Sequence, residues 1–403
     1  MNFLPIAALA LALSLGTAAG GTPISKEAER IHRSALVIDG HNDWPHNLRR
    51  DGHASLKGID LTESHPEYQT DIPRLVRGGL GAQFWVSFAP SQTAKEGTAA
   101  RTFLEQIDLI HRLVDAYPEH LELAWNSGDI RRIHGDGRIA SLIGVEGGHA
   151  IENSLCLLRT YYRLGVRYMT LTHSGSVGWA DACSDEALSG GLSPFGEEVV
   201  REMNRIGMLV DISHVSVETM EDVLRVSRAP IIASHSNAYA VTPSARNVPD
   251  PVLRKVRANG GIVMVNFFTG YVHPDGAEAS DGFFKVYKEL MAAGEDGKEQ
   301  AVAKYRMWKE AHPLPEAHIG HLVDHIDHIV KVAGIDHVGL GSDFEGVKTT
   351  PEGLEDVSCY PNVTEELLRR GYAEGDIRKI LGENFMRVFA EAEAVAKRIQ
   401  AEQ

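Results

Sequence analysis

The sequence is poor in cysteine and in positively charged residues, and each shortage excludes some kinds of site or partner. Only three of the 403 residues are cysteine, and the spacing of Cys156, Cys183 and Cys359 matches no cysteine-based zinc motif. Whether two of them form a disulfide stays open, because spacing cannot choose the pair. Lys and Arg total 40 against 55 Asp and Glu, a formal net charge of −15. Nucleic acid is therefore not an expected partner, since phosphate binding needs a basic face.

After the first 20 residues the apolar runs are only of strand length. That opening segment, MNFLPIAALALALSLGTAAG, has an apolar stretch and then small residues, as in a secretory signal peptide, although no Lys or Arg precedes the stretch. The stretch is short for a membrane span, and the polar ending EAVAKRIQAEQ has no lipid-anchor signal. We expect residues 1–20 to be a signal peptide and residues 21–403 a single domain. The mature protein is then soluble, without a stable membrane anchor, and periplasmic or extracellular.

Eight apolar segments of strand length recur along the remaining chain, with helical patterns between them. They are residues 35–39, 82–89, 139–146, 166–173, 207–214, 230–236, 261–268 and 337–343. Their apolar residues are continuous rather than alternating, which is typical of parallel strands covered by helices. The pattern predicts an α/β fold, a (β/α)8 TIM-like barrel. We expect an inserted loop–helix segment over one barrel end at 271–316, before the last strand, and closing helices over 362–398.

Most of these segments end in, or next to, a residue that can bind a metal or transfer a proton. The residues are His41, Asp43, Glu146, His173, His214, His235 and Asp343. In barrel enzymes the active site lies at the C-terminal ends of the strands. A single histidine at a strand end is more often structural than a ligand. Their repetition at six strand ends instead favours one shared site.

Five of these residues form a donor set that suits zinc. Three imidazoles, one aspartate and one glutamate offer nitrogen and oxygen ligands without a thiolate. Five ligands exceed what one tetrahedral zinc needs, and they suit two metals that share a bridging carboxylate. His41 and Asp43 are two positions apart, so an extended chain would point both to the same side.

Several motifs in a fixed order point to a family. DGHNDWP, GVEGGHAI, YMTLTHSG, VDISHVS, SHSNAYAVTPSARNVPD and GLGSDFEG follow one another along nearly all of the chain. With them the sequence resembles the membrane dipeptidase (renal dipeptidase) family of binuclear zinc peptidases. The resemblance implies hydrolysis of free dipeptides by a metal-bound hydroxide, and it leaves open a C-terminal D-residue and a homodimer. The sequence departs from the family in lacking a C-terminal anchor signal and in its few cysteines.

The resemblance also assigns metal ligands among these residues. It implies two Zn²⁺ per chain. His41 and Asp43 would bind the first zinc ion. His214 and His235 would bind the second, and Glu146 would bridge the two.

Three further roles follow from the same resemblance. His173 would hold the substrate at its scissile carbonyl, Asp343 would be the acid/base residue, and Arg246 in SARNVPD would bind the terminal carboxylate of the dipeptide. From the residues alone, two other functions stay open. One is hydrolysis of another amide, lactam or ester at the same binuclear site. The other is a non-enzymatic, exported metal-binding protein.

Overall fold

The computed structural model describes residues 24–292 and 295–403, so the predicted signal peptide lies outside the described residues. The strands are β1 (Val37–Asn42), β2 (Leu80–Phe88), β3 (Leu121–Leu123), β4 (Ile139–Glu146), β5 (Val166–Thr170), β6 (Leu209–Asp211), β7 (Ile232–Ala233), β8 (Ile262–Val265) and β9 (Val338–Leu340). Eight of them close into a parallel barrel, because β1 pairs with β2 and β9 while β2 pairs with β4. The predicted (β/α)8 barrel is confirmed.

The additional strand, β3, is not one of the eight barrel strands and was not predicted. It pairs with Ile139–Ser141 of β4, whereas β5 pairs with β4 from Ile143 onward. Since β2 occupies the other edge of β4, β3 lies on the same edge as β5 and extends it. A strand of three residues is too short to leave a periodic signal in the sequence.

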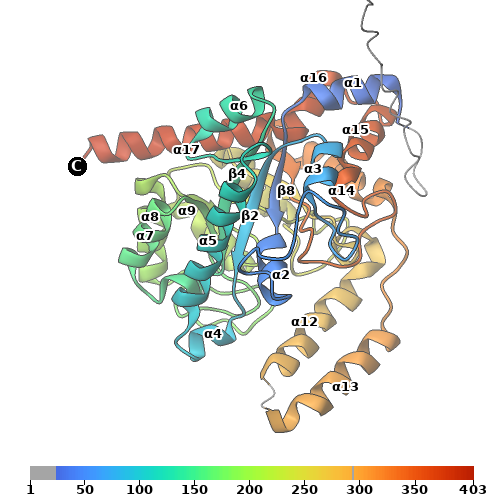
Figure 1. Ribbon diagram of the computed structural model, residues 1–403. Helices are drawn as coiled ribbons and strands as arrows, with labels where there is room; N and C mark the ends of the chain where they lie inside the picture. The colour runs from blue at the N-terminus through green and yellow to red at the C-terminus, as the bar shows by residue number, and fades with distance from the viewer. Residues whose placement is uncertain (1–23, 293–294) are drawn as a thin grey trace, which may run out of the picture.

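Helices connect the strands and cover the barrel (Figure 1). They are α1 (Lys26–Ser34), α2 (Trp44–Arg50), α3 (Ile72–Arg77), α4 (Gln92–Lys95), α5 (Ala99–Ala116), α6 (Ser127–Gly135), α7 (Leu155–Arg163), α8 (Pro194–Ile206), α9 (Val217–Val226), α10 (Asp250–Asn259), α11 (Thr269–Val272), α12 (Ala277–Ala292), α13 (Glu295–Ala311), α14 (Ile319–Val332), α15 (Tyr360–Arg369), α16 (Glu374–Arg378) and α17 (Asn384–Ala401). Local signals set their ends. Ser216 caps α9 by accepting a hydrogen bond from the Thr219 amide, and Gly207 ends α8 in the left-handed conformation.

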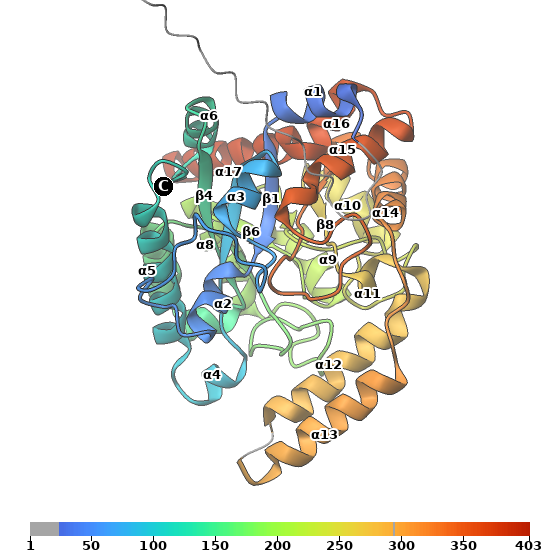
Figure 2. The same cartoon turned by 45° about the vertical axis from the view of Figure 1, so that its right-hand side comes forward.

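The C-terminal helix α17 closes one end of the barrel. Phe385 and Phe389 are buried in one cluster with Phe84 of β2 and Ile38 of β1, inside the barrel. Figures 1 and 2 show α17 lying across the end of the barrel that also carries α1, α6 and α16. This end is filled with apolar side chains. The site therefore forms at the opposite end of the barrel, where the carboxyl ends of the strands lie.

The predicted insertion between β8 and β9 contains α11, α12 and α13. The short helix α11 is buried, whereas α12 and α13 pack on each other. The insertion lies before the last strand, as predicted, and Figure 2 shows these two helices extending away from the barrel as a hairpin. Only its first part reaches the barrel mouth. Among the described helices, none combines the length and apolarity needed to cross a bilayer.

Candidate active site

The candidate residues gather at the open end of the barrel, although several lie beyond the strands rather than in them. Glu146 ends β4, as predicted, whereas His41 lies within β1, which continues past the predicted segment 35–39 to Asn42. His173, His214 and His235 follow β5, β6 and β7, in the loops after the strands. The predicted strands therefore extended too far, because the apolar pattern continues into buried loops that are not hydrogen-bonded as strands.

Asp43 reaches the site by a different route from the one predicted. It is the residue before α2, with φ −90° and ψ 17°, so alternation along a strand does not explain its direction. Its amide donates to the Phe344 carbonyl and the Asp343 amide donates to the His41 carbonyl. These two bonds join the loops after β1 and β9. Asp43 Oδ2 lies 3.3 Å from His41 Nε2.

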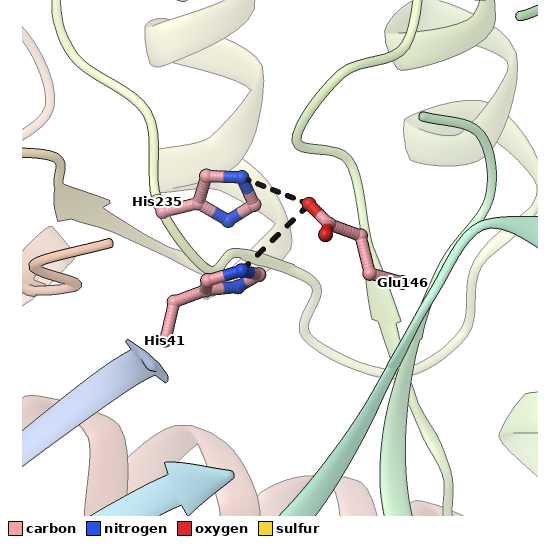
Figure 3. Close-up of side chains that lie close together, drawn as sticks. All are labelled: His41, Glu146 and His235. Carbon is pink, nitrogen blue, oxygen red and sulfur yellow. Dashed lines mark ion pairs between the residues drawn. The ribbon is translucent and has the colours of Figure 1, made fainter. Parts of the chain in front are cut away.

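Glu146 lies at the centre of the cluster. Its Oε1 atom is 3.0 Å from Nε2 of His214 and 3.3 Å from Nε2 of His235. His41 Nε2 is 3.7 Å from the same oxygen. Figure 3 shows the rings of His41 and His235 on one side of this carboxylate, each with a nitrogen toward it. One carboxylate therefore faces all three imidazoles, as a bridging group would.

Hydrogen bonds behind two of the imidazoles fix which nitrogen faces the cluster. The Tyr168 hydroxyl donates to the Gly40 carbonyl at 3.2 Å, so at 3.0 Å its oxygen can accept from Nδ1–H of His41. In the neutral ring, the form that binds a metal, this leaves a lone pair on His41 Nε2. A metal ligand is oriented in this way by the groups behind it.

His235 is held by the same kind of arrangement. The Ser234 hydroxyl donates to Oδ2 of Asp211 at 2.6 Å, and its oxygen lies 2.8 Å from Nδ1 of His235. His235 Nδ1–H therefore donates to Ser234, and Nε2 keeps its lone pair. This nitrogen lies 2.9 Å from Nε2 of His214. Asp211 also accepts from the Ser234 and Ser213 amides, which holds the carboxylate in place.

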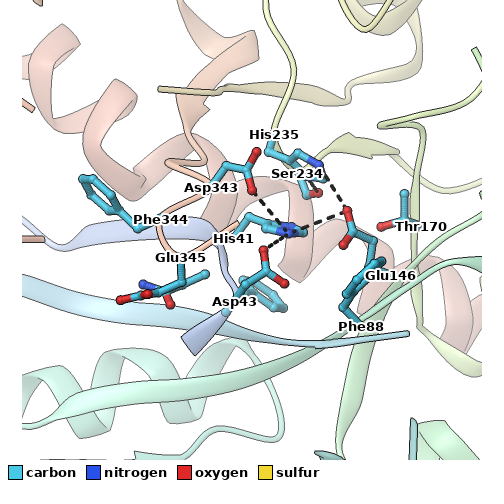
Figure 4. A network of polar contacts seen from close by, with 12 residues as sticks. His41, Asp43, Phe88, Glu146, Thr170, Ser234, His235, Asp343, Phe344 and Glu345 are labelled. Carbon is cyan, nitrogen blue, oxygen red and sulfur yellow. Dashed lines mark hydrogen bonds and ion pairs between the residues drawn. The ribbon is translucent and has the colours of Figure 1, made fainter. Parts of the chain in front are cut away.

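The electrostatics of the cluster favour a cation at its centre. Asp43, Glu146 and Asp343 are all buried, and Asp343 Oδ1 lies 4.0 Å from His41 Nε2 (Figure 4). Burial and neighbouring carboxylates raise the pKa of Glu146 well above its ordinary value, and burial raises that of Asp343 to about 7. Burial opposes protonation of His41, but Glu146 and Asp43 outweigh it and raise its pKa to about 10. Each shift has the sign expected for buried negative charge that lacks a positive partner.

The residues present fit a bound metal. Among buried atoms without a hydrogen-bond partner are Nε2 of His41 and Oδ1 of Asp43. Three groups of side chains have ligand atoms within 4.8 Å of one another, and they overlap. They are His41 with Glu146 and His235, Glu146 with His173 and His214, and His41 with Asp43 and Asp343. His173 and Asp343 thus belong to these groups together with the five predicted ligands.

His173 is a partly exposed, neutral imidazole that packs against aromatic rings. Burial lowers its pKa well below the ordinary value, and positive charges nearby act in the same direction. Its ring centroid is 4.4 Å from that of His214 and 4.6 Å from that of Phe88. Phe88 in turn packs edge-on against the ring of His46 at 5.1 Å. Neither Phe88 nor His46 carries a motif signal of its own in the sequence.

Arg246 is almost completely buried in the loop after β7. Its Nη2 donates to the main-chain carbonyl of His235 at 3.1 Å, and Nη1 donates to the Ser236 hydroxyl at 3.2 Å. The guanidinium carbon is 5.3 Å from the ring centroid of Tyr271. Within the described residues, no carboxylate forms an ion pair with this guanidinium, and its Nε has no hydrogen-bond partner. Glu146 and Asp343 of the donor cluster act on this charge only from beyond ion-pair distance. A buried charge without a direct partner is costly, so an anion is expected beside it.

Two candidate residues hold strained backbone conformations. His214 and Asp343 have φ of 67° and 65°, in the left-handed region that non-glycine residues rarely adopt. Such strain gathers at functional sites, where the surrounding structure enforces it. Glu345, at φ 71°, is the other acid nearby, but its Oε2 accepts from Asn47 at 2.8 Å.

Similarity to known proteins agrees with this geometry. A family model described as membrane dipeptidase (peptidase family M19) matches residues 25–403. The fold is similar to that of a probable dipeptidase, PvdM, from Pseudomonas aeruginosa, with 26% identity, a TM-score of 0.77, and coverage of 92% of this chain and 98% of the other. It is also similar to a metallopeptidase from Rhodobacter sphaeroides bound to a phosphinate mimic of the dipeptide L-Ala-D-Ala. That match has 26% identity, a TM-score of 0.73, and coverage of 89% and 99%.

The barrel, the buried donor cluster and these similarities define a metal-dependent hydrolase. More specifically, the chain belongs to the membrane dipeptidase family, peptidase family M19. It is accordingly a metallopeptidase, and the family resemblance noted in the sequence is confirmed.

Proposed function

We propose that the protein is a zinc-dependent dipeptidase that hydrolyses the single peptide bond of free dipeptides. The observation that carries this proposal is the buried, unpaired guanidinium of Arg246 beside the donor cluster. It donates to the carbonyl of His235, itself a member of the cluster, so its distance from the reacting bond is set by the fold. A free carboxylate is the anion that its planar donors match best.

The proposed metal ligands are His41, Asp43, Glu146, His214 and His235, with Glu146 between two zinc ions. When bound, zinc polarises the peptide carbonyl and makes water acidic enough to lose a proton near neutral pH. The tautomers inferred for His41 and His235 support this assignment, because each directs a lone pair at Glu146.

The chain's other residues would perform the remaining steps. Asp343 Oδ1 faces the cluster, where it can take the proton of the attacking water and deliver it to the leaving amine. His173 is neutral and can donate an N–H to the carbonyl oxygen as negative charge develops there. Arg246 would hold the terminal carboxylate, so that only one residue fits between it and the scissile bond.

We extend the proposal to dipeptides with a C-terminal D-residue. The Rhodobacter sphaeroides relative is bound to a mimic of L-Ala-D-Ala. At 26% identity over almost the whole chain, that ligand supports testing the same stereochemistry in this protein.

The test uses zinc-loaded protein and four substrates: L-Ala-L-Ala, L-Ala-D-Ala, L-Ala-L-Ala amide and L-Ala-L-Ala-L-Ala. Hydrolysis of the free dipeptides, with slow turnover of the amide and the tripeptide, is expected. Comparable rates on the amide would instead favour a broader amidohydrolase. Tight zinc binding without turnover of any substrate would favour a metal-binding protein. Loss of L-Ala-D-Ala hydrolysis alone would remove only the D-residue extension.

We also propose export. The apolar N-terminal segment predicts a mature protein that begins near residues 20–22 and lies outside the cytoplasm. N-terminal sequencing of protein recovered from each cell fraction tests this, and an intact start in the cytoplasmic fraction alone would contradict it.

A further inference from the structure

His325 is a buried histidine of α14 that none of these roles uses. Its side chain is completely buried, and both ring nitrogens are bonded. The Ala238 amide donates to Nδ1 at 3.0 Å, and Nε2 lies 3.1 Å from the Val272 carbonyl oxygen. Since an amide N–H can only donate, Nδ1 accepts, and Nε2–H donates to Val272. Burial lowers the pKa of His325 to about 3, so the ring stays neutral and keeps this arrangement.

The two hydrogen-bond partners of His325 belong to two different segments of the chain, one before Arg246 in the sequence and one after it. Ala238 belongs to the loop after β7 that carries Arg246, and Thr242 of the same loop lies 3.3 Å from Nε2 of His325. Val272 ends α11, the helix that carries Tyr271. The ring of Tyr271 faces the Arg246 guanidinium. One imidazole therefore joins the segment that carries the guanidinium to the segment that packs against it.

A second contact joins the same two segments. Nδ2 of Asn247 donates to the Thr242 carbonyl at 2.9 Å and to the Tyr271 carbonyl at 3.0 Å. Asn247 follows Arg246 directly and restrains the loop from within, whereas His325 restrains it from α14. Without His325, residues 238–242 of the loop would lose these hydrogen bonds to α14.

We propose that His325 is a positioning residue for Arg246, and through it for recognition of the terminal carboxylate of the substrate. The inference rests on the proposed function of Arg246. A bidentate pair between a guanidinium and a carboxylate requires a fixed orientation, and a displacement of about 1 Å can cost roughly 10²-fold in rate. His325 supplies this orientation without touching the substrate.

Three substitutions separate the two hydrogen bonds. His325→Asn keeps an acceptor near the place of Nδ1, and His325→Gln keeps a donor near the place of Nε2. His325→Phe keeps the ring volume and removes both bonds. His328→Gln is the matched control, because His328 lies on the same helix but bonds Asp250 at the surface, at 2.7 Å. For each variant, kcat and KM are measured on L-Ala-L-Ala and on its C-terminal amide, together with zinc content.

The expected result is a selective loss. His325→Phe should raise KM for the free dipeptide on the order of tenfold to 10²-fold, with zinc content unchanged and the amide little affected. His325→Asn and His325→Gln should lie between it and the wild type, and His328→Gln should match the wild type. If His325→Phe does not fold, the other two variants carry the test, since each retains one bond. Equal losses on both substrates would overturn the proposal.

A double-mutant cycle with Arg246→Ala distinguishes this proposal from the one on which it rests. If His325 acts through Arg246, adding His325→Asn to Arg246→Ala should cause no further loss of kcat/KM on the free dipeptide. Additive losses would contradict the positioning role. If Arg246→Ala alone lowers activity equally on the free and the amidated dipeptide, the carboxylate role itself fails. If Arg246→Ala discriminates and the His325 variants do not, only the inference about His325 fails.

Discussion

Asn266 donates a hydrogen bond of 2.8 Å from Nδ2 to Oδ2 of Asp343, and this contact turns the other carboxylate oxygen toward the donor cluster. Asn266 is itself fixed by Asn237, since the two exchange main-chain to side-chain hydrogen bonds of 3.0 Å. Asp343 is also held by the hydrogen bond that its backbone amide donates to the His41 carbonyl. Its orientation therefore depends on β1, β7 and β8 as well as on its own loop, as a group that transfers protons at a fixed place requires.

Asp343→Asn should abolish most turnover while leaving the zinc content high. The amide keeps the shape and the contact region of the carboxylate, but it cannot accept the proton of water, a role worth about 10²–10⁴-fold. Asn266→Ala should cause a smaller loss, since the carboxylate stays but is free to rotate. The measurements are kcat on L-Ala-L-Ala and elemental analysis. Retained turnover in Asp343→Asn would move proton transfer to another group.

Zinc analysis should return two ions per chain, and the ligand variants should lose them in different ways. Glu146→Gln should weaken both sites, because Glu146 faces all three imidazoles. His41→Ala should mainly empty one. Glu345→Gln is the control, because it removes a nearby, partly exposed carboxylate that Asn47 already binds. A reproducible value of one zinc with full activity in the wild type would refute the bridged pair.

Gly346→Ala should damage the site through steric contact alone. A Cβ atom at this position would overlap Oδ1 of Asp343 and Oδ2 of Asp43, and Asn266 holds the first of these carboxylates in place. We expect a loss of activity and of zinc with little change in secondary structure by circular dichroism. Gly375→Ala is the control, since a Cβ atom there meets nothing within 4 Å. Full activity in Gly346→Ala would mean that the two carboxylates are less tightly positioned than the structure indicates.

Phe385→Ala should destabilise the barrel without changing the site. Phe385 packs edge-on against Phe84 inside the closed end, with 5.4 Å between ring centroids. Removing a buried phenyl ring typically costs about 3–5 kcal/mol. Denaturant unfolding of the zinc-loaded protein measures the loss, and kcat below the transition should stay near the wild-type value. A large fall in kcat in the folded variant would show that the closed end influences the site.

The barrel was predictable from the sequence because each long strand is a continuous apolar run. The ends of the strands were not. Val210 and Ile212 look alike in sequence, yet only Val210 is in β6, because buried loop residues are as apolar as strand residues. The three-residue β3 and the outward direction of the α12–α13 hairpin also have no local signal. Both depend on contacts between distant parts of the chain.

The site was predictable where chemistry marks the residue type. Histidines and carboxylates at strand ends are conspicuous, so His41 and Glu146 could be named from the sequence. Tyr168, Asn266 and His325 could not, because tyrosine, asparagine and histidine are common in ordinary structural roles. What sets them apart is the partner each one meets. Those partners lie far away in sequence, at 127 positions for Tyr168 and His41 and 77 for Asn266 and Asp343.

Arg246→Lys is the sharpest test of whether the enzyme recognises dipeptides by their terminal carboxylate. Lysine keeps the positive charge but offers a single ammonium in place of the planar pair of donors, and it cannot bond the His235 carbonyl and the Ser236 hydroxyl in the same way. If the guanidinium binds the terminal carboxylate, Arg246→Lys should lose much of kcat/KM on L-Ala-L-Ala, and Arg246→Ala should lose more. The C-terminal amide, which presents no carboxylate, should change little in either variant, and zinc content should stay at the wild-type level. Should both substrates fall together with zinc retained, Arg246 would serve the structure of the barrel mouth, and recognition of a free C-terminus would belong to another residue.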